Sequence, residues 1–124
     1  MIAADTSSLI AYFQEEKAHD VEAITAALAQ NRLRLPCIVI TELLSDPDGA
    51  SAIASTIADL PRLDILDGYW ERAGKSRGIV LARGLKARLP DALVAQACID
   101  HKIPLIARNG DFRHFAKHCG LILA

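Results

Sequence analysis

MIAADTSSLI, residues 1–10, places four apolar residues directly before Asp5 and a run of three hydroxyl side chains. Residues 1–4 are typical of a short buried strand. Thr6, Ser7 or Ser8 can begin a helix that continues to Phe13, because a hydroxyl at a helix start accepts from free backbone amides. Asp5 itself can cap this helix or act as one ligand of a larger site. The stretch therefore predicts a strand followed at once by a helix, with an acid at the junction.

The same alternation of apolar strands and amphipathic helices continues along the chain. Further strands are expected at residues 33–35, 63–66, 104–107 and 121–123. Further helices are expected at residues 20–30, 38–45, 49–59, 68–83, 90–101 and 112–118. Parallel strands need crossover helices and are buried on both faces. The pattern thus predicts an α/β fold, and the length of 124 residues suits a single domain over residues 1–124.

Composition narrows the class of protein further. Apolar residues make up 52% of the chain, but no apolar run is long enough for a membrane span. The N-terminal stretch does not show the basic patch followed by a long apolar run that an export signal has. Cys37, Cys98 and Cys119 lie far apart beside apolar neighbours and are expected to be reduced thiols. We therefore expect a cytoplasmic protein that does not associate with membranes.

Charge is distributed unevenly between the two halves of the sequence. Residues 1–70 hold 4 Lys and Arg against 11 Asp and Glu, whereas residues 71–124 hold 10 against 4. This split suggests an anionic partner for the second half and a cationic one, a metal or a peptide, for the first. Equally, the two sets of charges can intermingle on the folded surface.

Four acids fall where a parallel sheet would place a site. In open parallel sheets, ligands bind beyond the carboxyl ends of the strands. Asp5 follows the first strand, Asp111 follows the strand at 104–107, and Asp91 opens the helix after a connection that leaves the same edge. Glu42 interrupts the apolar segment CIVITELL. Each has an ordinary structural alternative, as a helix-start residue or, for Glu42, as part of a solvent-exposed face.

Convergence of these acids would have a chemical consequence. Crowded carboxylates raise one another's pKa values unless a hard cation lies between them. Oxygen ligands without a nearby His or Cys favour Mg²⁺ or Mn²⁺ over zinc. The sequence therefore indicates a Mg²⁺ or Mn²⁺ site.

Four motifs in this order, DTSSLI, ITELL, LPDALVAQA and ARNGDFRHFA, resemble those of the PIN-domain ribonucleases, above all the VapC-like toxins of bacterial toxin-antitoxin pairs. The resemblance spans nearly the whole chain and implies a three-layer α/β/α fold with a short parallel central sheet. It also implies a catalytic, metal-holding quartet of Asp5, Glu42, Asp91 and Asp111. Thr6 and Asn109 match polar supporting positions. Ala107 departs from the pattern, because relatives often carry a hydroxyl residue there.

The resulting hypothesis is a metal-dependent endoribonuclease that acts as a toxin. A metal held by Asp5 and Asp91 would neutralise phosphate oxygens and lower the pKa of an attacking water, while Glu42 or Asp111 would orient that water or hold a second metal. The resemblance implies a cognate antitoxin and a homodimer. Basic side chains are candidates for contact with the RNA backbone, although a solvated helix face explains them equally well. They are Arg83, Lys86, Arg88 and Arg108.

Two other classes remain open at this point. A receiver-like phosphoacceptor signalling domain also holds Mg²⁺ with aspartates at a sheet edge, but it would need adjacent acids near the first strand, and Asp5 stands alone. A catalytically silent PIN-fold interaction protein would keep the fold without cutting RNA, and Ala107 is the one feature that favours it.

Overall fold

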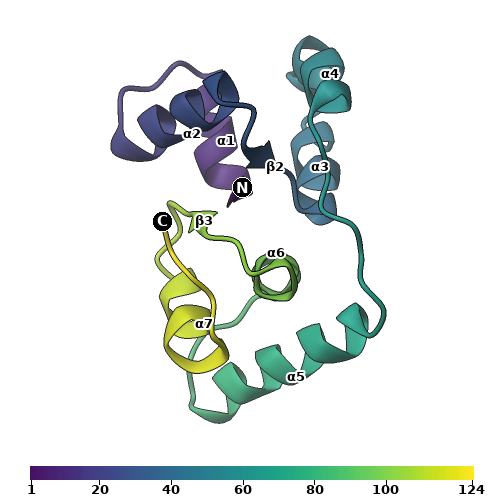
Figure 1. Cartoon of the computed structure of the whole chain (residues 1–124), viewed down its shortest axis with the longest axis vertical. Helices are drawn as coiled ribbons and strands as arrows, with labels where there is room; N and C mark the ends of the chain where they lie inside the picture. Colours follow the sequence, from purple (N-terminus) through teal and green to yellow (C-terminus); the bar gives the residue numbers. More distant parts are fainter.

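Three short parallel strands form the centre of the computed structural model, which describes residues 1–124 (Figure 1). β1 (Ile2–Ala4) lies between β2 (Leu33–Arg34) and β3 (Leu105–Ile106), giving the order β2-β1-β3. Ile2 pairs with Leu33, and Ala3 pairs with Leu105. Because all strands are parallel, their carboxyl ends share one edge of the sheet, and the segments that follow β1 and β3 meet there.

Helices cover the sheet from both sides (Figure 1). On one side α1 (Thr6–Phe13) packs against α2 (His19–Ala29). The other side holds three mutually packed helices, α5 (Tyr69–Ala82), α6 (Leu89–His101) and α7 (Phe112–Cys119). Between the two groups, α3 (Cys37–Leu44) contacts both α1 and α6 and carries α4 (Ala50–Asp59) on its outer side. The predicted α/β class with a short parallel central sheet is confirmed.

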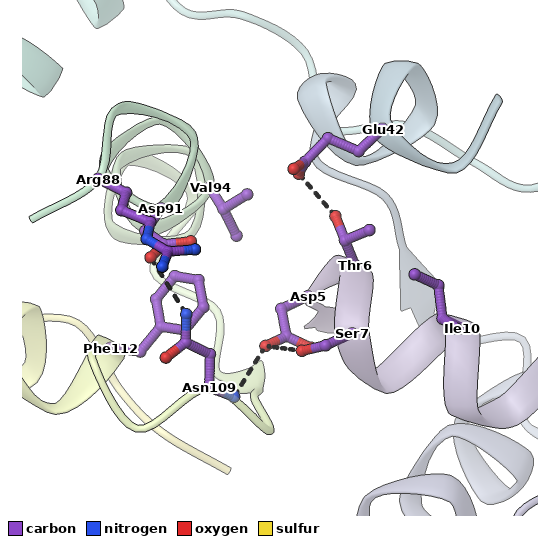
Figure 2. Close-up of a pocket in the computed structure, with 10 residues that line it drawn as sticks. All are labelled: Asp5, Thr6, Ser7, Ile10, Glu42, Arg88, Asp91, Val94, Asn109 and Phe112. Atoms are coloured by element: carbon purple, nitrogen blue, oxygen red, sulfur yellow. Dashed lines mark hydrogen bonds between the residues drawn. The ribbon is translucent and has the colours of Figure 1, made fainter. Parts of the chain in front are cut away.

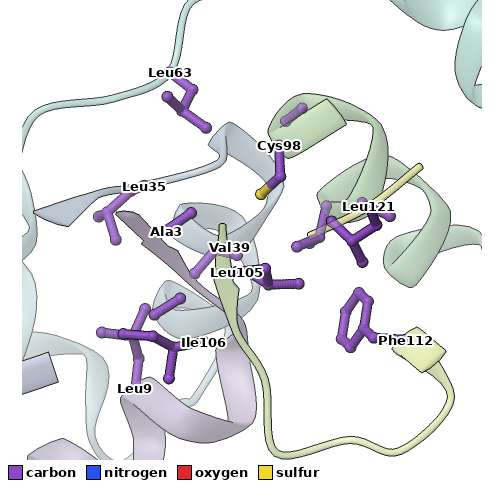
Figure 3. Packing of buried hydrophobic residues seen from close by; sticks show 14 of the residues in the cluster. Ala3, Leu9, Leu35, Val39, Leu63, Cys98, Leu105, Ile106, Phe112 and Leu121 are labelled. Carbon is purple, nitrogen blue, oxygen red and sulfur yellow. The ribbon is translucent and has the colours of Figure 1, made fainter. Parts of the chain in front are cut away.

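The hydrophobic core surrounds the strands on both faces (Figure 3). Ala3, Ala4 and Leu105 are fully buried, as expected for strands covered twice. On the side of α6 and α7 the largest buried side chains are Phe112 and Phe115. Phe112 matters for the site described below, because it anchors the start of α7 directly after the loop that follows β3.

Two of the expected strands do not form. Residues 63–66 take part in no bridge; a single bridge joins Leu35 to Arg62 just before them. Of the four, only Leu63 is buried, and Ile65 is 49% exposed. At residues 121–123 one bridge joins Leu123 to Leu105, and Ile122 is 53% exposed. Each segment has a single side chain in the core, which is too little to hold a continuous strand at the sheet edge.

Two features bear on the expectations from composition. The three cysteines are free thiols; Cys98 is buried, and burial raises its pKa to about 12. None of the helices is both long enough and apolar enough to cross a bilayer.

Candidate active site

A pocket of about 220 Å³ opens at the carboxyl ends of β1 and β3 (Figure 2). It brings together three of the four acids from the sequence analysis, Asp5 before α1, Glu42 on α3 and Asp91 on α6. The full lining consists of Asp5, Thr6, Ser7, Ile10, Glu42, Arg88, Asp91, Val94, Asn109 and Phe112. Carboxylates that are far apart in the sequence therefore face one cavity, Asp5 from the carboxyl end of β1 and the other two from α3 and α6.

Asp5 is the most constrained of these acids. It is the N-cap of α1 and only 2% exposed, and its Oδ1 accepts from the Ser8 amide at 2.8 Å. Its Oδ2 accepts from the Ser7 hydroxyl at 3.2 Å and from the amides of Arg108 at 3.1 Å and Asn109 at 3.4 Å. The expected hydroxyl cap is thus replaced by Asp5 itself. Four donors fix the orientation of this buried carboxylate.

Glu42 is held by a single short contact with α1. The Thr6 hydroxyl donates to Glu42 Oε1 at 2.7 Å (Figure 2). Thr6 is the first residue of α1, and Glu42 lies near the end of α3, so this hydrogen bond joins the two helices at the pocket wall. Thr6, expected as a supporting residue, has a polar partner within the site.

Asp91 lies in the first turn of α6 and is tied to Asn109. Asn109 Nδ2 donates to Asp91 Oδ2 at 3.2 Å, while Asn109 Oδ1 accepts from the Asp111 amide at 3.0 Å. The pKa of Asp91 is raised, first by burial and then by the negative charges of Asp111, Glu42 and Asp5, with Arg88 opposing them. All four acids are therefore electrostatically coupled at this carboxyl group.

Asp111 occupies a different position from the other three acids. It precedes α7, makes no side-chain capping bond and does not line the pocket. Its Oδ2 lies 3.6 Å from Lys86 Nζ, in a partly exposed ion pair. The structure thus places Asp111 at the periphery, near enough to influence Asp91 but engaged with a lysine.

The basic candidates also differ in position. Arg88 lines the pocket next to Asp91, whereas Arg83 is exposed at the end of α5. The guanidinium of Arg108 points to the opposite side, where it pairs with Glu16 and Asp20. This pairing joins the two oppositely charged halves of the sequence, so part of the charge asymmetry is neutralised within the fold.

Sequence reasoning missed two contributions to the site. Ser7 donates to Asp5 from the adjacent turn, and its spacing of two residues after an aspartate is a typical signal of local side-chain hydrogen bonding. The backbone amides of residues 108 and 109 also serve Asp5, and no side-chain pattern predicts a backbone donor. Ala107 is not among the residues that line the pocket and instead lines a separate hollow beside the start of α2.

The carboxylate and hydroxyl oxygens of the pocket are donors that suit a hard cation, and the Arg88 guanidinium lies beside them. In the arrangement observed, however, no three His, Cys, Asp or Glu side chains converge as the ligands of one ion would. Asp5, Glu42 and Asp91 are the residues of this pocket whose type and location fit a Mg²⁺ or Mn²⁺ ion.

Comparison with known proteins identifies the fold family. The PIN domain family model matches residues 2–118. VapBC2 from Rickettsia felis, solved bound to a DNA fragment from their promoter, contains a similar chain with a TM-score of 0.76 and 22% identity, covering 100% of this chain and 98% of that one. FitAcB from Neisseria gonorrhoeae contains another, with a TM-score of 0.72, 16% identity and coverage of 100% and 97%. No curated protein matches the sequence.

These structural likenesses establish a common fold. PIN domains are generally nucleases, so the family match supports a hydrolase that acts on nucleic acids. From its second residue through most of α7, the chain belongs to the PIN domain family.

Proposed function

We propose that this protein is a Mg²⁺- or Mn²⁺-dependent endoribonuclease and the toxin of a toxin-antitoxin pair. The observation that carries the proposal is the crowding at Asp91, whose pKa is raised by burial and by three other carboxylates. Such crowding is unfavourable for a protein alone, and a divalent cation would relieve it. The family match supplies the class of substrate.

Asp5, Asp91 and Glu42 would hold the cation. When bound, it would neutralise phosphate charge and lower the pKa of an attacking water. Asn109 keeps Asp91 turned toward the pocket, and Thr6 does the same for Glu42. Asp111 would act from the periphery, through its charge on Asp91.

The RNA backbone would enter beside Arg88. Its side chain lines the pocket and its positive charge acts on Asp91, which supports a contact with a phosphate near the acids. Lys86 lies on the same connection and is half exposed despite its pair with Asp111. Arg83 would contribute at longer range. Arg108 is the least suited of the four to bind RNA, because carboxylates already occupy its guanidinium.

An antitoxin segment would bind in the apolar groove next to the pocket. This groove of about 290 Å³ lies between α1, α3 and α4 and shares Ile10 and Glu42 with the acidic pocket. Ile53 of α4 lines it, whereas Ile57 of the same helix is buried in the core. The similar solved chains come from toxin-antitoxin complexes, which supports a protein partner. A cytoplasmic homodimer is proposed from the family resemblance alone.

The proposal is tested by incubating the purified protein with total cellular RNA and Mg²⁺ or Mn²⁺. Cleavage is expected to stop with EDTA and to return when the metal is restored. Asp91→Asn is the informative variant, because it removes a charge from the pocket and keeps an acceptor for Asn109. Asp59→Asn is the matched control, since Asp59 is exposed at the end of α4 and is expected to leave cleavage unchanged. Cleavage that persists in EDTA and in Asp91→Asn would refute the metal mechanism.

A catalytically silent PIN-fold interaction protein is the second candidate. It is favoured by the absence of a converged ligand set in the structure. It predicts no cleavage of any RNA and no stabilisation of the fold by Mn²⁺. The receiver-like alternative loses support, because the PIN match spans residues 2–118.

A further inference from the structure

The loop between β3 and α7 determines how two of the pocket acids are oriented. The amides of Arg108 and Asn109 donate to Asp5 Oδ2, and the Asn109 side chain donates to Asp91 Oδ2. A shift of this loop would therefore change the surroundings of both carboxylates at once. The position of the loop is as important to the pocket as the acids themselves.

On its outer side the loop is tied to the start of α2 by the Arg108 side chain. Arg108 Nε and Nη2 donate to the two oxygens of Asp20 at 2.8 and 3.0 Å, which is a forked pair, and Nη1 donates to Glu16 at 3.1 Å. Forked guanidinium–carboxylate pairs define orientation as well as distance. The Asp20 side chain is only 14% exposed, so its end of the contact is anchored in the protein.

The other side chains of the loop provide no equivalent forked tie, since Asp111 makes only one partly exposed contact, with Lys86 at 3.6 Å. Ala107 carries only a methyl group, and Gly110 carries no side chain. Asn109 faces the pocket, and Arg113 returns to the loop itself by donating to the Gly110 carbonyl at 3.0 Å. The pair pulls the pKa of Arg108 upward and that of Asp20 downward, chiefly through their mutual hydrogen bonds. Arg108 is thus the side chain that fixes the loop from outside.

We propose that Arg108 is a positioning residue of the acidic pocket: its fork on Asp20 and its contact with Glu16 hold the β3–α7 loop so that residues 108 and 109 orient Asp5 and Asp91. The proposal rests on the nuclease function proposed above and deepens it. It assigns to Arg108 a role different from RNA contact. The physical basis is preorganisation, since a displacement of about 1 Å in a catalytic arrangement can lower a rate by about 100-fold.

The test compares Arg108→Gln, Asp20→Asn and the double variant with Arg113→Gln as the matched control. Positioning predicts that Arg108→Gln and Asp20→Asn each lower kcat for RNA cleavage by roughly tenfold or more at nearly constant KM. The double variant should lose little more than either single one, because both remove the same contact. Arg113→Gln should retain the wild-type kcat.

RNA contact by Arg108 predicts a different pattern. In that case Arg108→Gln would raise KM and reduce the dependence of binding on salt, and Asp20→Asn would leave cleavage unchanged or improve it, because it frees the guanidinium. This pattern would overturn the proposal. The proposal would be supported if Arg108→Lys restored only a small part of kcat, because a lysine ammonium cannot form the forked pair with Asp20.

A second readout does not depend on cleavage. Amide hydrogen exchange of residues 108 and 109 should accelerate at least several-fold in Arg108→Gln and in Asp20→Asn, but not in Arg113→Gln, and Mn²⁺ affinity should fall in parallel. Unchanged exchange in the first two variants would refute positioning. If the wild type cut no RNA, the nuclease function would fail, while the exchange data would still decide whether Arg108 holds the loop.

Discussion

The two sides of the acidic pocket hold their carboxylates in opposite ways. On the side of α1 and α3, Asp5 accepts four hydrogen bonds and Glu42 accepts a short one from Thr6. On the side of α6 and α7, Asp91 has a single donor and a raised pKa, and Asp111 lies outside the lining beside Lys86. The first side is built by hydrogen bonds of the protein alone. The second side carries repulsion between carboxylates that Arg88 opposes only in part, which is where a cation would have the larger effect.

The largest effect is expected from Asp5→Asn, because this substitution disturbs the side of the pocket where the protein already satisfies the carboxylates with hydrogen bonds. An amide keeps only one carboxylate oxygen, so its NH₂ must face either the Ser8 amide or the amides of residues 108 and 109. We expect a loss of about 1–3 kcal/mol in the free energy of unfolding, the usual penalty for unsatisfied buried groups. RNA cleavage should fall by at least about 100-fold, beyond what second-shell changes typically cost. Urea unfolding and cleavage assays on the same sample check both effects; a stable and active variant would contradict them.

Thr6→Val should have the next largest effect, because it removes the donor to Glu42 and preserves the shape of the side chain. The free Glu42 carboxylate would no longer be oriented, and we expect a fall in kcat of roughly 10- to 100-fold. Stability should change by less than about 1 kcal/mol, since Thr6 is only partly buried.

Thr6→Ser is the matched control for this prediction, because it retains the hydroxyl. It should preserve most of the wild-type kcat. Equal losses in Thr6→Val and Thr6→Ser would show that the methyl group, and not the hydrogen bond, is what matters at this position.

A smaller effect is expected from Asp111→Asn. Asp111 does not line the pocket, and its partly exposed pair with Lys86 is of a kind that contributes at most about 1 kcal/mol. We expect a change in kcat of less than about tenfold, measured beside Asp91→Asn in the same cleavage assay. A loss as large as that of Asp91→Asn would return Asp111 to the set of metal ligands that the family resemblance implies.

The sequence predicted most elements because their signals are local. The spacing of apolar residues predicts the strand–helix junction at Asp5 and the helix at 68–83, and Pro90 marks the start of the helix at 90–101. The structure has these elements within a few residues of the predicted bounds. Strands at 63–66 and 121–123 were wrong, since those segments are apolar enough to be strands but Ile65 and Ile122 are exposed. The tertiary neighbours of an edge segment decide whether it forms more than one bridge, and the local sequence pattern carries no information about those neighbours.

The site was predictable to the extent that strand ends are predictable. Asp5 lies at the pocket because it directly follows β1, at the carboxyl edge of the parallel sheet. Glu42 and Asp91 reach the same pocket through the packing of α3 against α1 and α6. The peripheral place of Asp111 depends on how the loop after β3 turns, and the contact of Arg108 with Asp20 spans 88 residues of sequence. Neither the position of Asp111 nor the Arg108–Asp20 contact can be recognised from the neighbouring residues in the sequence. The sequence thus reveals which side chains gather, but not which of them are already engaged by other partners.

The smallest effect is the change in stability that we expect from Asp91→Asn in the metal-free protein. It tests directly the side of the pocket where carboxylates repel one another. The pKa of Asp91 is raised in the folded state, so between its unfolded and folded pKa values the native protein binds more protons, and stability falls as pH rises. Asparagine carries no such penalty. In EDTA at pH 7 the variant should therefore melt about 1–3 °C above wild type, and the difference should vanish below about pH 3.9, the ordinary carboxyl pKa. Adding Mg²⁺ should reverse the order, because binding stabilises the fold that has the fuller set of carboxylates. Thermal melts from pH 3.5 to 8 with EDTA or Mg²⁺ check the sign, and a variant less stable than wild type in EDTA at pH 7 would mean that the Asn109 hydrogen bond outweighs the repulsion at Asp91.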